Sequence, residues 1–289
     1  MKKKILFTLI LLLFLSYIKA QLLWKITGKG LKQPSYLFGT HHLIPIQFLD
    51  TVPGLYKAFN DCDMVVGEMV MNSVDVMAKM QEAAMMPDHI KITDLLSDSD
   101  YQVVDKELKA VLKFGLKELS IMNPSVILTL YQLEIFKKMT GCTDDNQSDS
   151  YFQLVANEKG KKVVGLETID QQIAILFGNG TLQRQADILV ETVNSKDSVL
   201  KQMIRLNKLY KAGKIDELVE ISTQKGDVTD MTENEYSKLV DDRNADWVTQ
   251  LPQLMHENSC FIAVGALHIG GKNGLVKQLQ RAGYKVKAA

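Results

Sequence analysis

Short apolar runs divide the chain into segments. Runs of this kind, bounded by glycine, proline or polar residues, are typical of buried strands. The sequence contains them at residues 22–27, 35–39, 63–70, 161–169 and 260–265. The first two runs enclose the segment GKGLKQP, whose glycine and proline residues predict a turn between two strands.

Helical periodicity fills the longer segments between these runs. Apolar residues recur three and four positions apart, which predicts amphipathic helices. The apolar stripes are Val104, Leu108, Val111, Leu112 and Leu119; Leu182, Ala186, Leu189, Val190 and Val193; and Val199, Met203, Leu206 and Tyr210. Thr232 and Glu235 form a capping box that opens a further helix, which runs towards Trp247. Buried strands separated by long helices predict an α/β fold, with a central mixed sheet surrounded by helices.

The first 20 residues read as a secretory signal rather than as part of the fold. A basic MKKK segment precedes an apolar stretch at residues 5–18 and a small residue, Ala20, at a cleavage point. The stretch is shorter than the roughly 20 residues of a spanning helix, although an uncleaved membrane tether is the alternative. We therefore expect a signal at 1–20, one domain at 21–289, and a periplasmic or extracellular location. In that oxidising location at least one of the three cysteines stays unpaired, namely Cys62, Cys142 or Cys260.

The charge of the chain is balanced. Lysine plus arginine and aspartate plus glutamate each number 34. No net field attracts the protein to nucleic acid or to an anionic membrane, so neither is expected as a partner.

Two glutamates lie inside apolar strands, where an acid is not expected. Glu68 and Glu167 each follow a Val-Val-Gly segment within two residues. Both runs are apolar enough to be buried on two faces, and an ionised carboxylate there is costly unless it is paired, hydrogen-bonded or bound to a metal. The alternative is a glutamate that points outward at the edge of a sheet.

Two histidines end apolar strands in the same way. His42 follows Gly39 by three positions, and His268 follows Gly265 by three positions. The repetition of Gly-x-x-His and of Val-Val-Gly before glutamate indicates two related halves. A single strand-end histidine is more often a hydrogen-bonded structural residue. His41 should point to the opposite side of the strand, into solvent, because successive side chains alternate.

An arginine lies on the apolar stripe of the capped helix. Arg243 is four residues after Leu239 and four before Trp247, and Asn244 is four after Val240. Arg243 should therefore point inward. A buried guanidinium requires a carboxylate or an anion, so it clamps one of the glutamates, faces a ligand, or makes a structural salt bridge. The histidines, glutamates and arginine converge only if their strands share one sheet.

Five segments, in order along the chain, resemble the TraB/GumN family, which includes the Tiki metalloproteases. The segments are LLWKITGKGLKQPSYLFGTHHL, VVGEM, GKKVVGLETIDQQ, DDRNADWV and FIAVGALHIGGKNGLVKQLQRAGYKV. The resemblance implies a fold related to the erythromycin esterase and ChaN-like group. It also implies a site with two Gly-x-x-His motifs and acidic residues. The matching positions are Gly39 and His42, Gly265 and His268, Glu68, Glu167, Arg243 and Asn244.

The resemblance implies an exported metal-dependent hydrolase, a peptidase that acts on a peptide or protein. His42 and His268 would bind a divalent manganese, cobalt or zinc ion. Glu68 and Glu167 would share the roles of metal ligand and general base. Arg243 would stabilise an oxyanion or orient a carboxylate, and Asn244 would hydrogen-bond the substrate or a ligand.

A non-catalytic protein on the same scaffold is the alternative function. It would capture a peptide, a haem-like cofactor or a metal. The sequence contains neither the H-E-x-x-H motif of other metallopeptidases nor the G-x-S-x-G motif of serine hydrolases. A serine hydrolase is therefore not expected, and the sequence leaves the substrate, the metal and the oligomeric state open.

Overall fold

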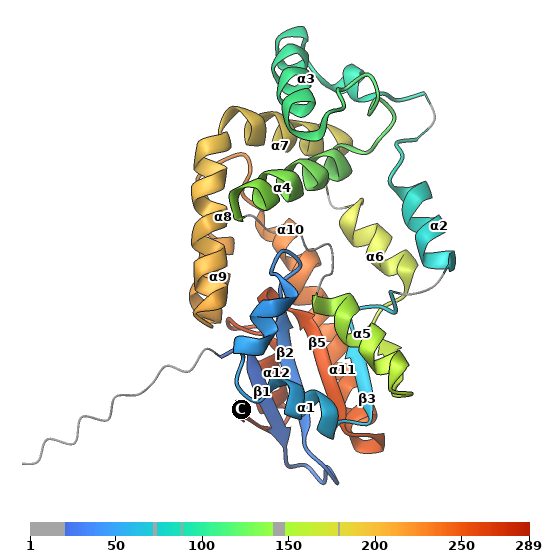
Figure 1. Ribbon diagram of the computed structural model, residues 1–289, viewed down its shortest axis with the longest axis vertical. Helices are drawn as coiled ribbons and strands as arrows, with labels where there is room; N and C mark the ends of the chain where they lie inside the picture. The colour runs from blue at the N-terminus through green and yellow to red at the C-terminus, as the bar shows by residue number, and fades with distance from the viewer. Residues whose placement is uncertain (1–20, 72–73, 88, 141–147, 179) are drawn as a thin grey trace, which may run out of the picture.

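The computed structural model describes residues 21–289 except 72–73, 88, 141–147 and 179 (Figure 1). The predicted signal at 1–20 and one of the three cysteines, Cys142, lie outside the described residues. The other two cysteines, Cys62 and Cys260, are buried and free. None of the helices within the described ranges combines the length and the apolar character that crossing a membrane requires.

Six strands form one mixed sheet, which confirms the predicted α/β class. The strands lie in the order β4-β3-β5-β2-β1-β6. The four strands from β4 to β2 are parallel, whereas β1 is antiparallel to both β2 and β6. Their bounds are β1 Leu23–Thr27, β2 Ser35–Thr40, β3 Met64–Gly67, β4 Lys162–Gly165, β5 Cys260–Gly265 and β6 Lys285–Ala288.

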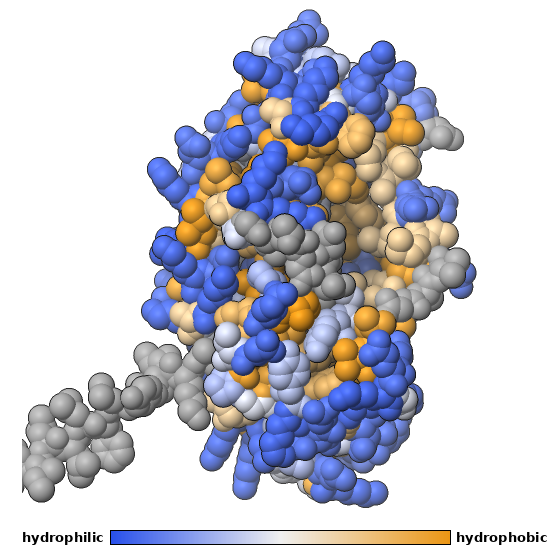
Figure 2. Space-filling model, in the orientation of Figure 1, coloured by the Kyte–Doolittle hydropathy of each residue, from blue (hydrophilic) through white to orange (hydrophobic). Residues whose placement is uncertain are grey.

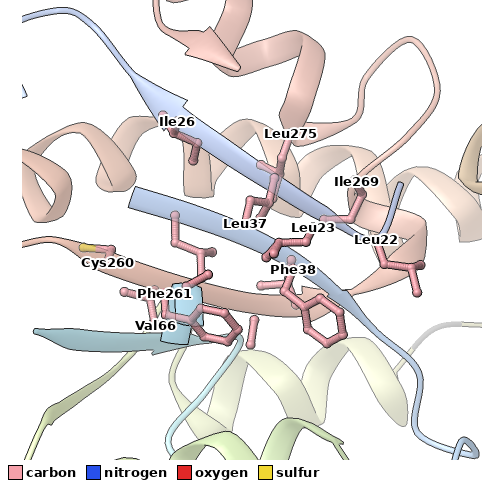
Figure 3. Close-up of a cluster of buried hydrophobic side chains, with 14 of the residues drawn as sticks. Leu22, Leu23, Ile26, Leu37, Phe38, Val66, Cys260, Phe261, Ile269 and Leu275 are labelled. Atoms are coloured by element: carbon pink, nitrogen blue, oxygen red, sulfur yellow. The ribbon is translucent and has the colours of Figure 1, made fainter. Parts of the chain in front are cut away.

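Helices cover both faces of this sheet. In Figure 1, α1 (Leu55–Asp61) and α5 (Ser148–Glu158) lie in front of the strands, and α11 (Asp242–Glu257) and α12 (Leu275–Arg281) lie behind them. Successive residues of a strand alternate between the two layers: Figure 3 shows Leu37 directed towards Leu275 of α12 and Phe38 directed to the opposite face. This alternation explains why the strands are apolar at almost every position.

A second apolar cluster holds a group of helices over the sheet edge at which the parallel strands end (Figure 1). Its members include Val104 and Leu108 of α3 (Asp98–Leu112), Ile127 of α4 (Pro124–Thr140), and Ala186 and Leu189 of α7 (Leu182–Asn194). The apolar stripes predicted over α3 and α7 therefore face the interior, although Leu119, predicted on the same stripe as Val104, lies beyond the end of α3. The next predicted helix, α8 (Lys196–Lys211), ends before Gly213, which has a positive φ of 64°.

The remaining helices connect these two parts. They are η1 Ile46–Thr51, α2 Val74–Ala83, η2 Ile92–Leu95, α6 Ile169–Leu176, α8 Lys196–Lys211, α9 Ile215–Ser222, α10 Glu233–Tyr236, the π-helical η3 Ser237–Asp241, and η4 Ala266–His268.

The strand predicted within 161–169 differs from expectation in its burial. β3 is buried along its whole length, but β4 is an edge strand with partly exposed residues. The prediction that both runs are buried on two faces was therefore wrong for β4. Apolar composition alone did not distinguish an edge strand from a central one, because β4 still packs against α5 on one face.

Candidate functional site

The predicted polar residues lie at the carboxyl ends of four neighbouring parallel strands. His42 follows β2, Glu68 follows β3, Glu167 follows β4, and His268 follows β5. Ligands of open α/β sheets bind at this edge. The expectation that these strands share one sheet is confirmed, and the sheet order makes the four ends neighbours.

Arg243 joins three of the strand ends. Its Nε and Nη2 atoms lie 2.7 and 3.0 Å from the two carboxylate oxygens of Glu167. Nη2 also lies 2.6 Å from Oε2 of Glu68, and Nη1 lies 3.1 Å from Nε2 of His268. The inward orientation predicted from the helical stripe is correct, and the guanidinium binds both predicted acids rather than one.

The local backbone helps to place this arginine. The helix that opens with the predicted capping box at Thr232 passes through the π-helical segment Ser237–Asp241 before α11 begins. The Leu239 carbonyl in that segment accepts a hydrogen bond from Arg243 Nη1, and the guanidinium lies 4.7 Å from the centre of the Trp247 ring. Single π-helical turns occur frequently at functional sites.

Glu167 uses both carboxylate oxygens to hold its neighbours. Oε1 accepts from Arg243 and from Trp247 Nε1, the latter at 2.9 Å, and Oε2 accepts from Arg243 and from Gln172 Nε2, the latter at 2.6 Å. The side chain is only 4 % exposed. A carboxylate has about four lone-pair sites, and here four donors occupy them.

Glu68 is less enclosed than Glu167. Its Oε2 pairs with Arg243, and its Oε1 accepts the backbone N–H of Gly265 at 2.8 Å. Oε1 also lies 3.9 Å from Nε2 of His268. Because the side chain remains 18 % exposed, Glu68 is the acid that a ligand can reach.

Asn244 fixes the protonation of His268. Its Nδ2 atom donates to two backbone carbonyls, those of His268 and Asn273, at 3.2 and 3.0 Å. Carbonyls only accept, so the Oδ1 atom is the one that lies 2.8 Å from His268 Nδ1. Nδ1 therefore carries the proton, and the lone pair of the neutral ring lies on Nε2, beside Arg243 and Glu68.

His42 pairs with an acid that the sequence analysis did not identify. Its Nδ1 atom lies 2.9 Å from Oδ2 of Asp149, on the first turn of α5. Thr40 Oγ1 donates to Oδ1 of the same carboxylate. The sequence carries no clear signal for this pair, because Asp149 is an ordinary residue for a helix start and becomes notable only where α5 meets β2.

His41 does not face solvent. Its ring is half-buried, with its centre 4.9 Å from that of Tyr210 and 6.5 Å from that of Phe136. The prediction for His41 was therefore wrong, and His42 is the more exposed of the two, with 57 % of its side chain accessible. The alternation rule fails here because β2 ends at Thr40, before either histidine.

A comparison with protein families identifies the ancestry of this arrangement. A model described as the TraB/PrgY/gumN family matches residues 22–288. The chain belongs to the TraB/PrgY/gumN family. No curated protein and no solved structure matches it. The match confirms the resemblance drawn from the sequence, and it spans both the sheet and the helices above it.

The charges at this family member's site are strongly coupled. Burial acts to raise the pKa of Glu68, but the charges of His268 and Arg243 and the Gly265 N–H outweigh it and lower the pKa to about 2. Burial lowers the pKa of His268 to about 4. At neutral pH Glu68 is therefore ionised and His268 is neutral, which are the forms that bind a metal ion.

The pKa of His42 moves in the opposite direction. Asp149 raises it to about 9, with a smaller contribution from Glu68. The charge of His42 also acts on the pKa of His268. The two histidines of the Gly-x-x-His motifs thus share one electrostatic environment around Glu68.

The donor types at the site fit the divalent metal that the resemblance implies. His268 Nε2 and Glu68 Oε1 are a neutral imidazole nitrogen and a carboxylate oxygen, each supported by a hydrogen bond to the rest of the protein, as metal ligands usually are. In the part of the chain that the structure describes, no group of three or more His, Cys, Asp and Glu side chains is arranged to hold an ion. Arg243 Nη1, which contacts His268 Nε2, would have to yield that contact to a metal.

Proposed function

We propose that this protein is an exported metal-dependent hydrolase, a peptidase whose site is built on His42, His268 and Glu68. The observation that carries the proposal is the fixed tautomer of His268. Asn244 leaves the lone pair of the neutral ring on Nε2, which contacts Arg243 Nη1 at 3.1 Å and lies 3.9 Å from Oε1 of the ionised Glu68 at the carboxyl edge of the sheet. A metal ion that displaced the Arg243 contact would have this imidazole nitrogen and this carboxylate oxygen as neighbouring ligands.

The structure supports different roles for the two acids. Glu68 is partly accessible and is proposed as the metal ligand or the general base. Glu167 is enclosed by four donors, and we assign it to holding Arg243 and Trp247 in place. From the sequence alone, either glutamate could be the metal ligand or the general base. The present assignment keeps these roles for Glu68.

A bound manganese, cobalt or zinc ion would polarise the substrate carbonyl and lower the pKa of a water molecule. Arg243 supplies a positive charge beside Glu68 and is proposed to stabilise negative charge that develops on the carbonyl oxygen. Asn244 is proposed to fix His268, because its polar atoms are committed to His268 and to backbone carbonyls.

The surface beside the site supports a peptide as substrate. Figure 2 shows a hollow between the sheet and the upper helices, with apolar residues on the side where α2 and α6 lie. On these helices Met77 is 62 % exposed and Leu176 is 44 % exposed. α6 also carries Gln172, which contacts Glu167, so apolar side chains of an extended ligand at the site would meet this surface. Export is proposed from the basic and apolar residues at 1–20.

The test combines metal analysis with cleavage of a peptide library. The mature protein should bind stoichiometric metal and cleave peptides with added manganese, cobalt or zinc, and a chelator should stop cleavage. His268→Ala should reduce cleavage by more than about 100-fold, because loss of a metal ligand exceeds the effect of losing its outer partner. His256→Ala is the matched control, since His256 is exposed on α11. Stable peptide or metal binding without turnover would contradict the enzyme and favour the binding-protein alternative.

A further inference from the structure

Asp149 is a buried carboxylate that contacts residues outside its own helix. It lies in the first turn of α5 and is 7 % exposed. An acid at this position usually interacts with the free N–H groups of its own helix. The two oxygens of Asp149 instead meet Thr40 and His42, which lie at the end of β2.

These contacts determine which nitrogen of His42 carries a proton. An ionised carboxylate only accepts hydrogen bonds, so the Nδ1 atom that faces Oδ2 at 2.9 Å must be protonated. Thr40 holds the other oxygen, Oδ1. Oδ2 is buried and makes no hydrogen bond of ordinary geometry within the described residues, so its contact with His42 Nδ1 is an ion-pair contact rather than a well-aligned hydrogen bond. The Nδ1 proton therefore compensates an oxygen that would otherwise lie unpaired.

In the second Gly-x-x-His motif, a side-chain oxygen also faces Nδ1 of the histidine, but it comes from a different residue type. At His268, the Asn244 side-chain oxygen faces Nδ1 at 2.8 Å. At His42, an Asp149 oxygen occupies the equivalent place. In the neutral ring of His42, Nε2 is then the nitrogen that remains for a ligand, whereas Nε2 of His268 contacts Arg243 Nη1 at 3.1 Å. Metal-binding histidines usually donate their second N–H to a carboxylate or carbonyl, which fixes the tautomer and makes the other nitrogen more basic.

We propose that Asp149, supported by Thr40, is a positioning residue that holds His42 with Nδ1 protonated, so that Nε2 is the nitrogen that binds a metal once the ring has lost its second proton. The metal part of this inference rests on the proposed function. The tautomer part concerns the metal-free protein and stands independently of it.

The first test measures the tautomer directly. Nitrogen-15 NMR of the His42 ring is recorded on metal-free protein at pH 10, where the ring is neutral. The wild type should show Nδ1–H alone, and Asp149→Asn should shift the population towards Nε2–H. Asp149→Asn keeps the size of the side chain, and Thr40→Val, a second variant that removes only the supporting hydroxyl, should shift it less. An unchanged His42 spectrum in Asp149→Asn overturns the proposal.

The second test measures the affinity for manganese alone by titration calorimetry. Asp149→Asn should raise the dissociation constant about 10–100-fold. The same substitution in a His42→Ala background should cause little further change, because Asp149 acts through His42. An equal loss in both backgrounds indicates a general structural role and overturns the proposal. Asp170→Asn is the matched control, since Asp170 is an exposed acid paired with Lys79 on α2.

The two tests separate this inference from the proposed function. If the wild type neither binds manganese nor cleaves peptides, the proposed function fails and the NMR result alone decides the role of Asp149. If the wild type binds manganese and Asp149→Asn binds it equally well, the positioning role fails and the proposed function stands.

Discussion

At the scale of single residues, the site is defined by which polar atoms are already committed. Glu167 has four donors and Asn244 has both of its amide protons bonded, so neither has much capacity left for a ligand. Glu68 remains partly accessible, whereas the Nε2 atom of His268 can bind a ligand only if Arg243 Nη1 gives up its 3.1 Å contact. The sequence predicted that these residues lie together but assigned them interchangeable roles, because hydrogen-bond partners depend on contacts between distant segments.

The buried groups predict that the metal-free protein loses stability on acidification. Both His268, with a pKa lowered to about 4, and Glu68, with a pKa lowered to about 2, bind protons more readily when unfolded. Folding stability that is present above the unfolded-state pKa of each group is therefore lost as the pH falls, between about 6.5 and 4 for His268 and between about 4.5 and 2 for Glu68. His41, whose pKa is lowered to about 4 by burial, acts in the same direction.

Urea unfolding in the presence of chelator tests this prediction. The free energy of unfolding of the wild type should decrease from pH 6.5 to pH 4. In His268→Gln the decrease over this window should be smaller, because one of the two contributing histidines has been removed. An identical pH profile for both proteins would show that His268 is not buried as a neutral ring.

At the scale of elements, the sequence predicts a helix or strand correctly where that element depends on residues close together in the chain. The capping box at Thr232 is present, with its side chain accepting from Glu235 N. The first α-helix, α1, begins at Leu55 after Gly54, whose φ is 74°, and the 3₁₀ turn η1 lies before it. Short-range propensity does not distinguish such a 3₁₀ turn from an α-helix.

The glycine of β4 is predicted to be needed for close packing beside the site. A Cβ atom at Gly165 would lie 2.8 Å from the Val70 nitrogen and 2.9 Å from the Met69 Cα, which are backbone atoms. Gly165→Ala should therefore reduce the free energy of unfolding by about 1–3 kcal/mol through overpacking. Gly226→Ala is the control, because the nearest atom to a Cβ there is 4.0 Å away. Equal denaturation midpoints for the two variants would contradict this account.

At the scale of the whole molecule, two separate apolar clusters stabilise two parts of the structure. One lies on both faces of the sheet and carries the polar residues at its carboxyl edge, and the other joins the helices above that edge. The arrangement leaves a hollow between them (Figure 2). No local pattern predicts such a hollow, because it depends on how two separately packed groups of elements meet.

This division predicts that the helical cluster can be weakened without direct damage to the site. Leu108 is fully buried on α3, so Leu108→Ala should reduce the free energy of unfolding by about 2–5 kcal/mol. Val103→Ala on the same helix is the control, because Val103 is 47 % exposed and should change stability by no more than about 0.5 kcal/mol. Under conditions where Leu108→Ala remains folded, its manganese affinity should equal that of the wild type. A loss of affinity in the folded variant would show that the helical cluster shapes the site.

The sequence alone determined the α/β class, most strands, the capped helix with its inward arginine, and the family. These features follow from periodicity, capping and short motifs, which act between residues close together in the chain. The tertiary structure decided that β4 is an edge strand, that His41 is half-buried, that Glu167 is enclosed while Glu68 stays accessible, and that Asp149 pairs with His42. Each of these depends on contacts between residues far apart in the sequence, where burial and hydrogen-bond partners are set by packing rather than by local pattern.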